Sequence, residues 1–283
     1  MTYTTNIDIA RAALEKGNWL IRTDREGTSV DASGFVWSPV GEWTTAPDWD
    51  PTTRFGHGLY GQSQKYSGYN PPGGSRVVFC DYAGEAVGFE GEEGEVKVEA
   101  ARVLLVNDLS ALTGLTVERS LSLAGCTGLV SLTLPEGFRV GESLYLYNCT
   151  ALEKLTLPED MMVGGSLCLA GCRSLTSLTV PESVMSLSLA GCRSLTSLTL
   201  PKIMEVEGDL DLSGCAGLTS LTLPERLTVR GNLDISGCTG LTSLTLPKTI
   251  KVEGTLDLHD CTFLRYLVLP DGLRVRLLAV WRP

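Results

Sequence analysis

Histidine, basic residues and long apolar runs are all scarce in this chain. Only two of the 283 residues are histidine, so catalytic arrangements built on histidine have little material. Lysine and arginine total 23 against 33 aspartate and glutamate, and the formal net charge is -10. Phosphate binding depends on clustered Lys and Arg, and a membrane span needs roughly 18 or more apolar residues in a row. We therefore expect neither nucleic acid nor a membrane as a partner.

Several site signatures are missing as well. The chain has no C-x-x-C pair and no cluster of histidines, so we expect no metal site. It has no G-x-G-x-x-G phrase that opens a helix, so we expect no Rossmann nucleotide site. The first residues lack a basic segment followed by an apolar one, which favours a cytoplasmic protein without a secretory signal. At 43% hydrophobic residues, the chain is too apolar for wholesale disorder.

The main feature that the sequence does contain is a tandem repeat, which the positions of its nine cysteines and 13 prolines help to reveal. Seven cysteines recur every 23 residues, except that Cys172 and Cys192 are 20 residues apart. Seven prolines keep the same spacing, nine residues after each cysteine. The unit is C-x-x-L-x-x-L-x-L-P, then a variable loop, then L-x-L-x-x-C. The periodic cysteines are Cys126, Cys149, Cys172, Cys192, Cys215, Cys238 and Cys261.

The repeat phrase predicts stacked parallel strands. An L-x-L alternation places both leucines on one face of a short strand. A single strand cannot bury that face, whereas coils stacked about 4.8 Å apart bury all the leucines in one column. Proline lacks an N–H group and therefore ends each strand at a corner. We expect strands on two or three sides of each coil and little helix.

These phrases resemble leucine-rich repeats, whose core is L-x-x-L-x-L. The 23-residue length, the proline and the cysteine are most similar to the bacterial surface-antigen (BspA-like, treponemal) subclass. The resemblance covers residues 103–283 and implies about seven coils of a parallel β-solenoid. In that family the cysteine usually faces inward. We therefore expect a ladder of buried, reduced thiols, which suits a reducing compartment.

The short repeat predicts an irregularity in the solenoid. The missing residues fall after Pro181, so we expect a notch or kink there. Arg173 and Arg193 replace the Thr or Ala found at that position in other repeats, and we expect them to stack beside the notch. Two alternatives stay open: a pair of solvated arginines, or a site that contacts an anion or a carboxylate.

Hydroxyl side chains occupy the outward positions of the L-x-x-L-x-L strand. They predict a flat Ser/Thr face, on which Thr179, Thr199, Thr222 and Thr245 are candidate binding residues. Such an array also raises the remote alternative of ice binding. Threonine is in addition simply a good strand residue.

The first 102 residues form a separate, aromatic-rich unit without the repeat phrase. Four of the five tryptophans lie there. The pattern predicts a helix over 7–16 and strands around 19–22, 75–82 and 95–106. The interpretation is a small α+β domain that acts as a cap on the first repeat, since the terminal units of solenoids must be shielded.

A phrase in this unit, FGHGLYGQSQKYSGY over 55–69, followed by the strand RVVFCDY, resembles the NAD-cradling segment of ADP-ribosyltransferases of the poly(ADP-ribose) polymerase type. The resemblance covers about 30 residues. It implies NAD as cofactor, held by the cofactor-binding residues His57, Gly58 and Tyr60. It implies catalytic roles for Arg22, which would hold the NAD ribose, for Tyr69, which would stack on nicotinamide, and for Glu95 or Glu99, which would stabilise the oxocarbenium-like centre.

Together these patterns predict a mainly β protein: a leucine-rich-repeat solenoid with a small α+β N-terminal domain. The leading functional hypothesis is a non-enzymatic protein-binding module without a cofactor. The alternative is an ADP-ribosyltransferase-like protein whose solenoid recruits the target. The apolar C-terminal residues predict either that Trp281 covers the last coil of a monomer or that two chains meet end to end.

Overall fold

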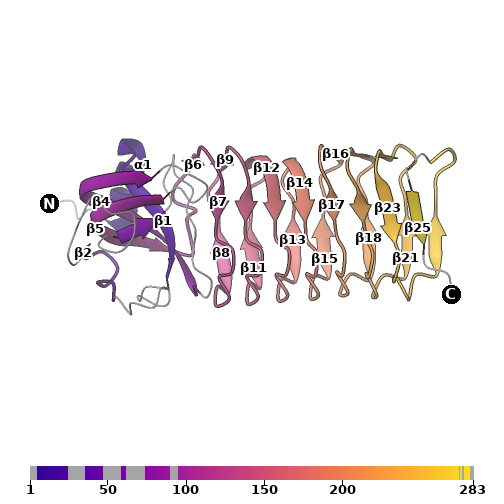
Figure 1. Cartoon of the computed structure of the whole chain (residues 1–283), viewed down its shortest axis with the longest axis horizontal. Coiled ribbons are helices and arrows are strands. Elements are labelled where there is room, and N and C mark those ends of the chain that lie inside the picture. The colour runs from indigo at the N-terminus through magenta and orange to yellow at the C-terminus, as the bar shows by residue number, and fades with distance from the viewer. Residues whose placement is uncertain are drawn as a thin grey trace.

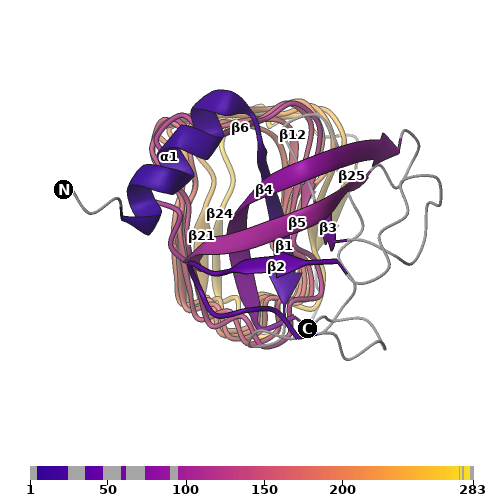
Figure 2. The same ribbon diagram turned by 90° about the vertical axis from the view of Figure 1, so that its left-hand side faces the viewer.

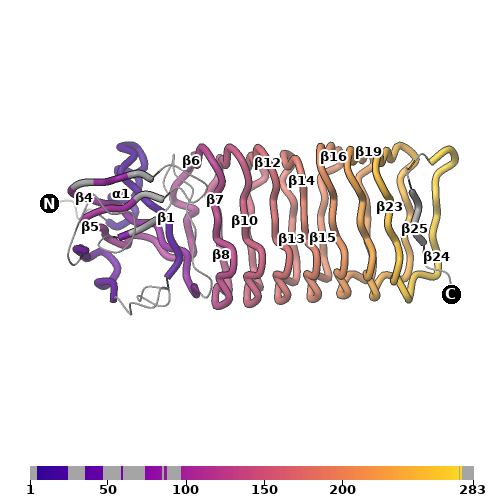
Figure 3. Tube along the Cα trace, viewed as in Figure 1, coloured from indigo at the N-terminus to yellow at the C-terminus, as the bar shows by residue number. Residues whose placement is uncertain are grey.

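The structure is a computed structural model. It describes residues 5–24, 36–46, 59–61, 74–89, 95–273, 275 and 277–280. An N-terminal unit with one helix and a sheet stands at one end of a straight row of coils (Figure 1). Each coil lies directly on the previous one along the whole row (Figure 3). The expectation of a mainly β protein, a parallel solenoid with a small α+β unit, is confirmed.

Helix α1 (Asn6–Lys16) begins and ends where its local sequence dictates. The Thr5 side chain accepts from the Asp8 backbone N–H, and the Asp8 carboxylate accepts from the Thr5 backbone N–H, which is a capping box. Gly17 ends the helix in the left-handed region, at a φ of 74°. Ala10 and Ala13 are its buried residues, and the half-buried Ile9 and Leu14 pack against the same apolar core.

The N-terminal sheet has the strand order β1-β4-β5-β2, and β3 pairs with β5. Its strands are β1 (Trp19–Asp24), β2 (Trp43–Thr45), β3 (Leu59–Gly61), β4 (Arg76–Phe89) and β5 (Glu95–Val106). All of the pairs are antiparallel. Two bidentate ion pairs, Asp24–Arg76 and Asp81–Arg102, cross between neighbouring strands.

This sheet covers the open end of the solenoid (Figure 2). Trp19, Ile21 and Phe79 belong to the same apolar core as the first coils. The backbone continues the contact: Asn107 N–H donates to Val77 O at 2.8 Å, and Gly128 N–H donates to Gly74 O at 3.0 Å. The boundary expected after residue 102 falls within β5, so an unbroken strand joins the two parts. The N-terminal unit therefore caps the first coil.

The solenoid coil has three sides. The first is the long sheet, in which parallel strands stack in register and carry the L-x-L phrase before each cysteine. Its inward leucines, such as Leu144, Leu167 and Leu187, are fully buried one above another. Its strands are β7 (Leu121–Ser122), β10 (Leu144–Tyr145), β12 (Met162–Cys168), β14 (Ser183–Ser188), β17 (Leu210–Asp211), β20 (Leu233–Asp234), β23 (Thr255–Leu258) and β25 (Leu277–Val280).

The second side, which we call the hydroxyl side, carries the strands before each proline. They are β8 (Ser131–Thr133), β11 (Lys154–Thr156), β13 (Ser177–Thr179), β15 (Ser197–Thr199), β18 (Ser220–Thr222), β21 (Ser243–Thr245) and β24 (Tyr266–Val268). The third side follows the proline. It contains β6 (Thr116–Val117), β9 (Arg139–Val140), the first residues of β12 and β14, and then β16 (Ile203–Val206), β19 (Arg226–Val229) and β22 (Lys251–Val252).

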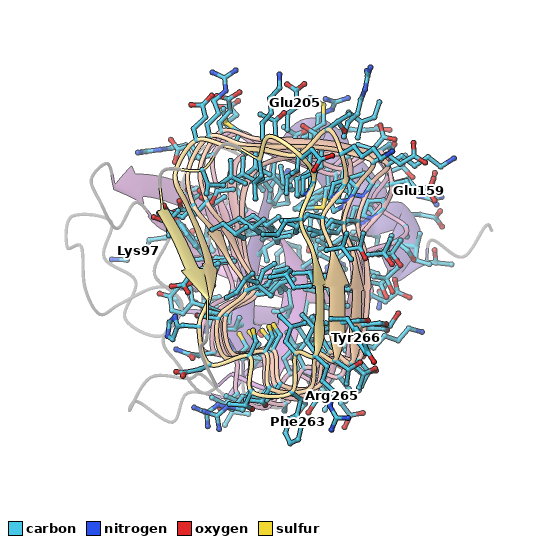
Figure 4. All side chains as sticks on the ribbon, turned by 90° about the vertical axis from the view of Figure 1, so that its right-hand side faces the viewer. Lys97, Glu159, Glu205, Phe263, Arg265 and Tyr266 are labelled. Carbon is cyan, nitrogen blue, oxygen red and sulfur yellow. The ribbon has the colours of Figure 1, made fainter. Side chains whose placement is uncertain are left out.

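The seven repeat cysteines line one inner corner, where their sulfur atoms form a row (Figure 4). All seven are at most 1% exposed and are free thiols, which confirms the expected inward ladder. Six of them donate to a leucine or isoleucine carbonyl of the preceding coil, as Cys215 Sγ does to Leu189 O at 3.2 Å. Burial raises the pKa of Cys192 and of Cys238 to about 12, because the apolar corner disfavours a thiolate.

Candidate functional site

The structure separates two of the candidate transferase residues, Arg22 and Glu99, which both lie in the described part of the chain. Arg22 lies on β1 opposite Val78, and its guanidinium carbon is 4.5 Å from the centroid of the Trp37 ring. Val78 pairs in turn with Val106 at the end of β5. Glu99 is seven residues before Val106 on that strand, which at roughly 3.3 Å per residue is about 20 Å away. The antiparallel β4–β5 pair therefore places Arg22 at one end of the sheet and Glu99 near the middle of β5.

Among the other residues of that hypothesis, Tyr60 lies in a described strand. His57, Gly58 and Tyr69 lie outside the described residues. Tyr60 belongs to β3, where its backbone stands opposite Lys97 of β5. Lys97 has a fully buried side chain (labelled in Figure 4), which the sequence reasoning missed. The alternation of a strand indicates which residues face a core. It does not indicate that a neighbouring segment of the chain will bury a charged side chain such as that of Lys97.

The hydroxyl side presents its Ser and Thr side chains outward and in register. Thr179 stands opposite Thr199, and Thr222 opposite Thr245, all four of them exposed. This ladder is interrupted, however. The strands form three separate sheets, β8–β11, β13–β15 and β18–β21–β24, with no pairing between β15 and β18. The expected Ser/Thr face is thus present locally, and it is not one continuous flat array.

The two arginines do not lie beside the notch. Arg173 and Arg193 are exposed at the corner that follows each cysteine, at the start of the hydroxyl side. The residues around the notch follow the proline, at the far end of that strand. About five residues of strand, roughly 17 Å, separate the two places. The two arginines occupy equivalent positions of adjacent coils, as expected, since Ser177 pairs with Ser197. Their predicted place beside the notch is wrong, because the arginines and the deletion fall on different corners of the coil.

The notch itself is confirmed as an open groove of about 920 Å³. We call it the short-coil groove. The loop of the short coil, residues 181–185, lines one part, and residues 201–203, 205 and 207 of the longer loop in the next coil line another. Backbone hydrogen bonds join the two coils before and after these loops. Val180 N–H donates to Thr199 O at 2.9 Å before them, and Gly208 N–H donates to Met185 O at 2.9 Å after them. Between these points the longer loop has three additional residues and bulges outward.

Acidic side chains also line up on the outer face of the long sheet. Asp211, Asp234 and Asp257 stand in register, and each accepts a hydrogen bond from the backbone N–H two residues later. The bond from His259 Nδ1 to Asp257, 2.7 Å long, raises the pKa of that histidine. Among the described residues no group of three or more His, Cys, Asp or Glu is arranged to hold a metal ion.

Comparison with known proteins identifies the repeat. Residues 114–205 and 186–276 match the BspA type leucine rich repeat region, in six copies, and together they span more than half of the chain. The chain belongs to the BspA-type leucine-rich repeat family. This BspA-type solenoid is also similar to the crystal structure of a leucine-rich repeat protein from Bacteroides ovatus ATCC 8483, at 15% identity over 85% of this chain and 90% of that one, with a TM-score of 0.25. A search of curated proteins finds no match.

The family match begins at residue 114 and therefore does not include the N-terminal unit. None of the comparisons supports the resemblance of residues 55–69 to ADP-ribosyltransferases. The features that distinguish this BspA-type solenoid are therefore those that depart from its own repeat: the short-coil groove and the last coil of the hydroxyl side.

That last coil replaces small outward residues with large ones. We call Phe263, Arg265, Tyr266, Val268 and Leu269 the terminal patch (Figure 4 labels the first three). Phe263 is 59% exposed and Tyr266 is 71% exposed. Tyr266 stands in register with Ser243, and Val268 with Thr245. Alignment of the repeats alone reveals that Phe263 and Tyr266 replace smaller residues. Aromatic residues and arginine are enriched at protein interfaces, whereas serine is depleted there.

Proposed function

We propose that this chain is a non-enzymatic binding module, which presents the hydroxyl side and the terminal patch to a protein partner. The observation that carries this proposal is the terminal patch. The stack of strands ends in exposed aromatic, aliphatic and cationic side chains on and beside β24, and among the described residues this strand pairs with β21 alone. Clusters of this composition supply most of the binding energy in many interfaces.

Charge supports a protein as the partner. A net charge of -10 disfavours nucleic acid and anionic membrane surfaces. None of the helices in the described ranges is long and apolar enough to cross a membrane. We also propose a reducing compartment such as the cytoplasm, because nine free thiols, eight of them buried, form no disulfide. No cofactor enters this proposal.

Photocrosslinking tests the proposal. A benzoylphenylalanine at Ser243, next to Tyr266, should crosslink a protein in extracts of cells that produce the chain. The same group at Glu136, an exposed residue of the third side that lies three coils before β16 and outside the lining of the short-coil groove, should not. Tyr266→Ser combined with Phe263→Gly restores the residues that other repeats carry and should abolish the crosslink. Equal labelling from both positions would contradict the proposal, as would labelling that the double variant leaves unchanged.

An NAD assay tests the alternative function. The non-enzymatic proposal expects that millimolar NAD leaves the thermal midpoint of the full chain unchanged and that NAD is not hydrolysed. Stabilisation by NAD that is lost in Arg22→Ala would overturn the proposal in favour of the transferase hypothesis.

A further inference from the structure

We propose that the short-coil groove binds an extended segment of a partner protein in which lysine or arginine alternates with apolar residues, and that this segment adds as a strand to the free edge of β16. The inference rests on the proposed function, since it names a second partner site on the same binding module. It concerns the third side of the coil and uses no residue of the terminal patch.

The backbone supplies the first argument. On the third side β14 pairs with β12, and β16 pairs with β19. No pairing joins β14 to β16, although all of their residues are described. Lys202 O and Val206 O accept from Arg226 N–H and Arg230 N–H on the β19 side. Because backbone groups alternate along a strand, Ile203 and Glu205 direct their N–H and C=O groups to the opposite edge of this strand, which is about 13 Å long. Such an edge is a template for strand addition, in which main-chain hydrogen bonds provide affinity.

Apolar side chains supply the second argument. Ile203 is 57% exposed and Met185 is 46% exposed, on opposite loops of the groove. Leu200, also in the lining, is half-buried, whereas its counterparts Leu223 and Leu246 in the next two coils are buried. A partner side chain placed beside Ile203 would remove this surface from water, at about 25 cal/mol per Å² of apolar area.

Charge supplies the third argument and selects the partner. Four carboxylates line the groove, Glu159, Glu182, Glu205 and Glu207, against one cation, Lys202. Glu207 also contacts Arg230, with 3.2 Å between the closest atoms. Glu182 and Glu205 are exposed and form no ion pair with any described residue (Figure 4 labels Glu159 and Glu205). The lining is therefore complementary to a cationic segment.

The strand pattern of β16 sets the spacing of the partner. Ile203 and Glu205 point outward on alternate positions, while Met204 and Val206 are buried. Residues that face each other across neighbouring strands interact in pairs. A partner strand would place an apolar side chain beside Ile203 and a lysine or arginine, two positions along, beside Glu205.

The test uses the full chain and a fluorescein-labelled heptapeptide in which lysine and valine alternate. Fluorescence anisotropy should show saturable binding that weakens as salt is added. A peptide with glutamate in place of lysine should not bind. Glu182→Lys combined with Glu205→Lys should weaken binding at least tenfold. The matched control, Glu153→Lys combined with Asp271→Lys, makes the same charge change away from the groove and should bind as the wild type does.

Each of the other outcomes overturns the inference. Equal losses in both double variants would show attraction to overall charge only. Two further peptides distinguish strand addition from surface adsorption, because each carries N-methyl groups on one of the two backbone edges. The peptide methylated on the edge that pairs with β16 should lose binding, and the other should keep it. Binding of both peptides would contradict strand addition. If sedimentation shows self-association of the chain that the groove variant abolishes, the occupant is a second copy and not a cationic partner.

The two proposals fail separately. Loss of the Ser243 crosslink without loss of peptide binding would end the role of the terminal patch and leave the groove standing. Loss of peptide binding in chains that still crosslink through Ser243 would end the groove proposal alone.

Discussion

At the scale of single residues, the position before each repeat cysteine sets the corner of the coil. Its backbone is left-handed, with φ between 57° and 77° in all seven coils. Glycine holds this position five times, and Asn148 and Asp260 hold the other two. Glycine adopts this region freely, and Asn and Asp tolerate it better than other residues. The left-handed corner is what allows the adjacent thiol to point into the core.

Gly191 offers a clean test of that requirement, because a Cβ added there would meet nothing within 4 Å. Gly191→Ala should lower the free energy of unfolding by about 1 kcal/mol through backbone strain alone. Gly191→Asn should cost less, as Asn148 occupies the equivalent position. Urea unfolding followed by circular dichroism measures both. Equal costs for Ala and Asn would contradict the assigned role of the left-handed corner.

The thiols differ in accessibility. Cys168 points outward from β12 and is partly exposed, whereas the other eight thiols are buried. In the native protein, Ellman's reagent should modify Cys168 alone, and all nine thiols should react after unfolding. Fast modification of a second thiol in the native protein would contradict the buried ladder.

The same ladder makes stability depend on pH. Burial raises the pKa of Cys238 from 9.0 to about 12. The stability that this thiol contributes is therefore fully present below pH 9 and is lost as the pH rises toward 12, because the unfolded thiol ionises while the buried one does not. The thermal midpoint should fall across this window, and it should fall less steeply in Cys238→Ala. If the thermal midpoint of the variant falls with pH as steeply as that of the wild type, the raised pKa of Cys238 is contradicted.

At the scale of elements, the length of one loop creates the groove. Replacing residues 182–186 with residues 225–232 adds the three missing residues to the short coil. The third side should then pair continuously, which should raise the thermal midpoint by about 2–4 °C per kcal/mol gained and abolish binding of the lysine–valine peptide.

The matched control exchanges loops of equal length. Residues 225–232 replaced by residues 202–209 should leave both the midpoint and peptide binding unchanged. The thermal midpoint could instead fall in the chain with the lengthened loop and stay unchanged in this control. That result would show that the short loop is required for the coils to stack.

The elements that repeat were predictable from the sequence, and the places where the repeat changes were predictable only in part. Alternating leucines and the cysteine spacing predict the long sheet and the inward thiols, since burial acts on every coil in the same way. The 20-residue spacing predicts the notch. The arginines were misplaced because positions close in the chain can fall on different corners of a coil. The unpaired edge of β16 depends on how two loops separate in space, which no local pattern encodes.

At the scale of the whole molecule, the N-terminal unit and the first coils share one core. Trp19 and Phe79 stack with ring centroids 5.7 Å apart and bury the end of the column. A truncated chain of residues 107–283 leaves that end uncovered and should aggregate, whereas the full chain should not. Size-exclusion chromatography with light scattering distinguishes the two. A monodisperse truncated chain with the thermal midpoint of the full chain would contradict the capping role.

The ladders between coils also determine how the molecule would yield under tension. Leu144 bonds in register to the coils on both sides of it, and this pattern continues along the solenoid. A pull on the two ends would therefore detach coils one after another. A 23-residue coil releases roughly 76–83 Å of extended chain, and the 20-residue coil about 66–72 Å. A force–extension trace would then show nearly equal increments of contour length and a single shorter increment. The shorter increment would identify the moment at which the 20-residue coil detaches.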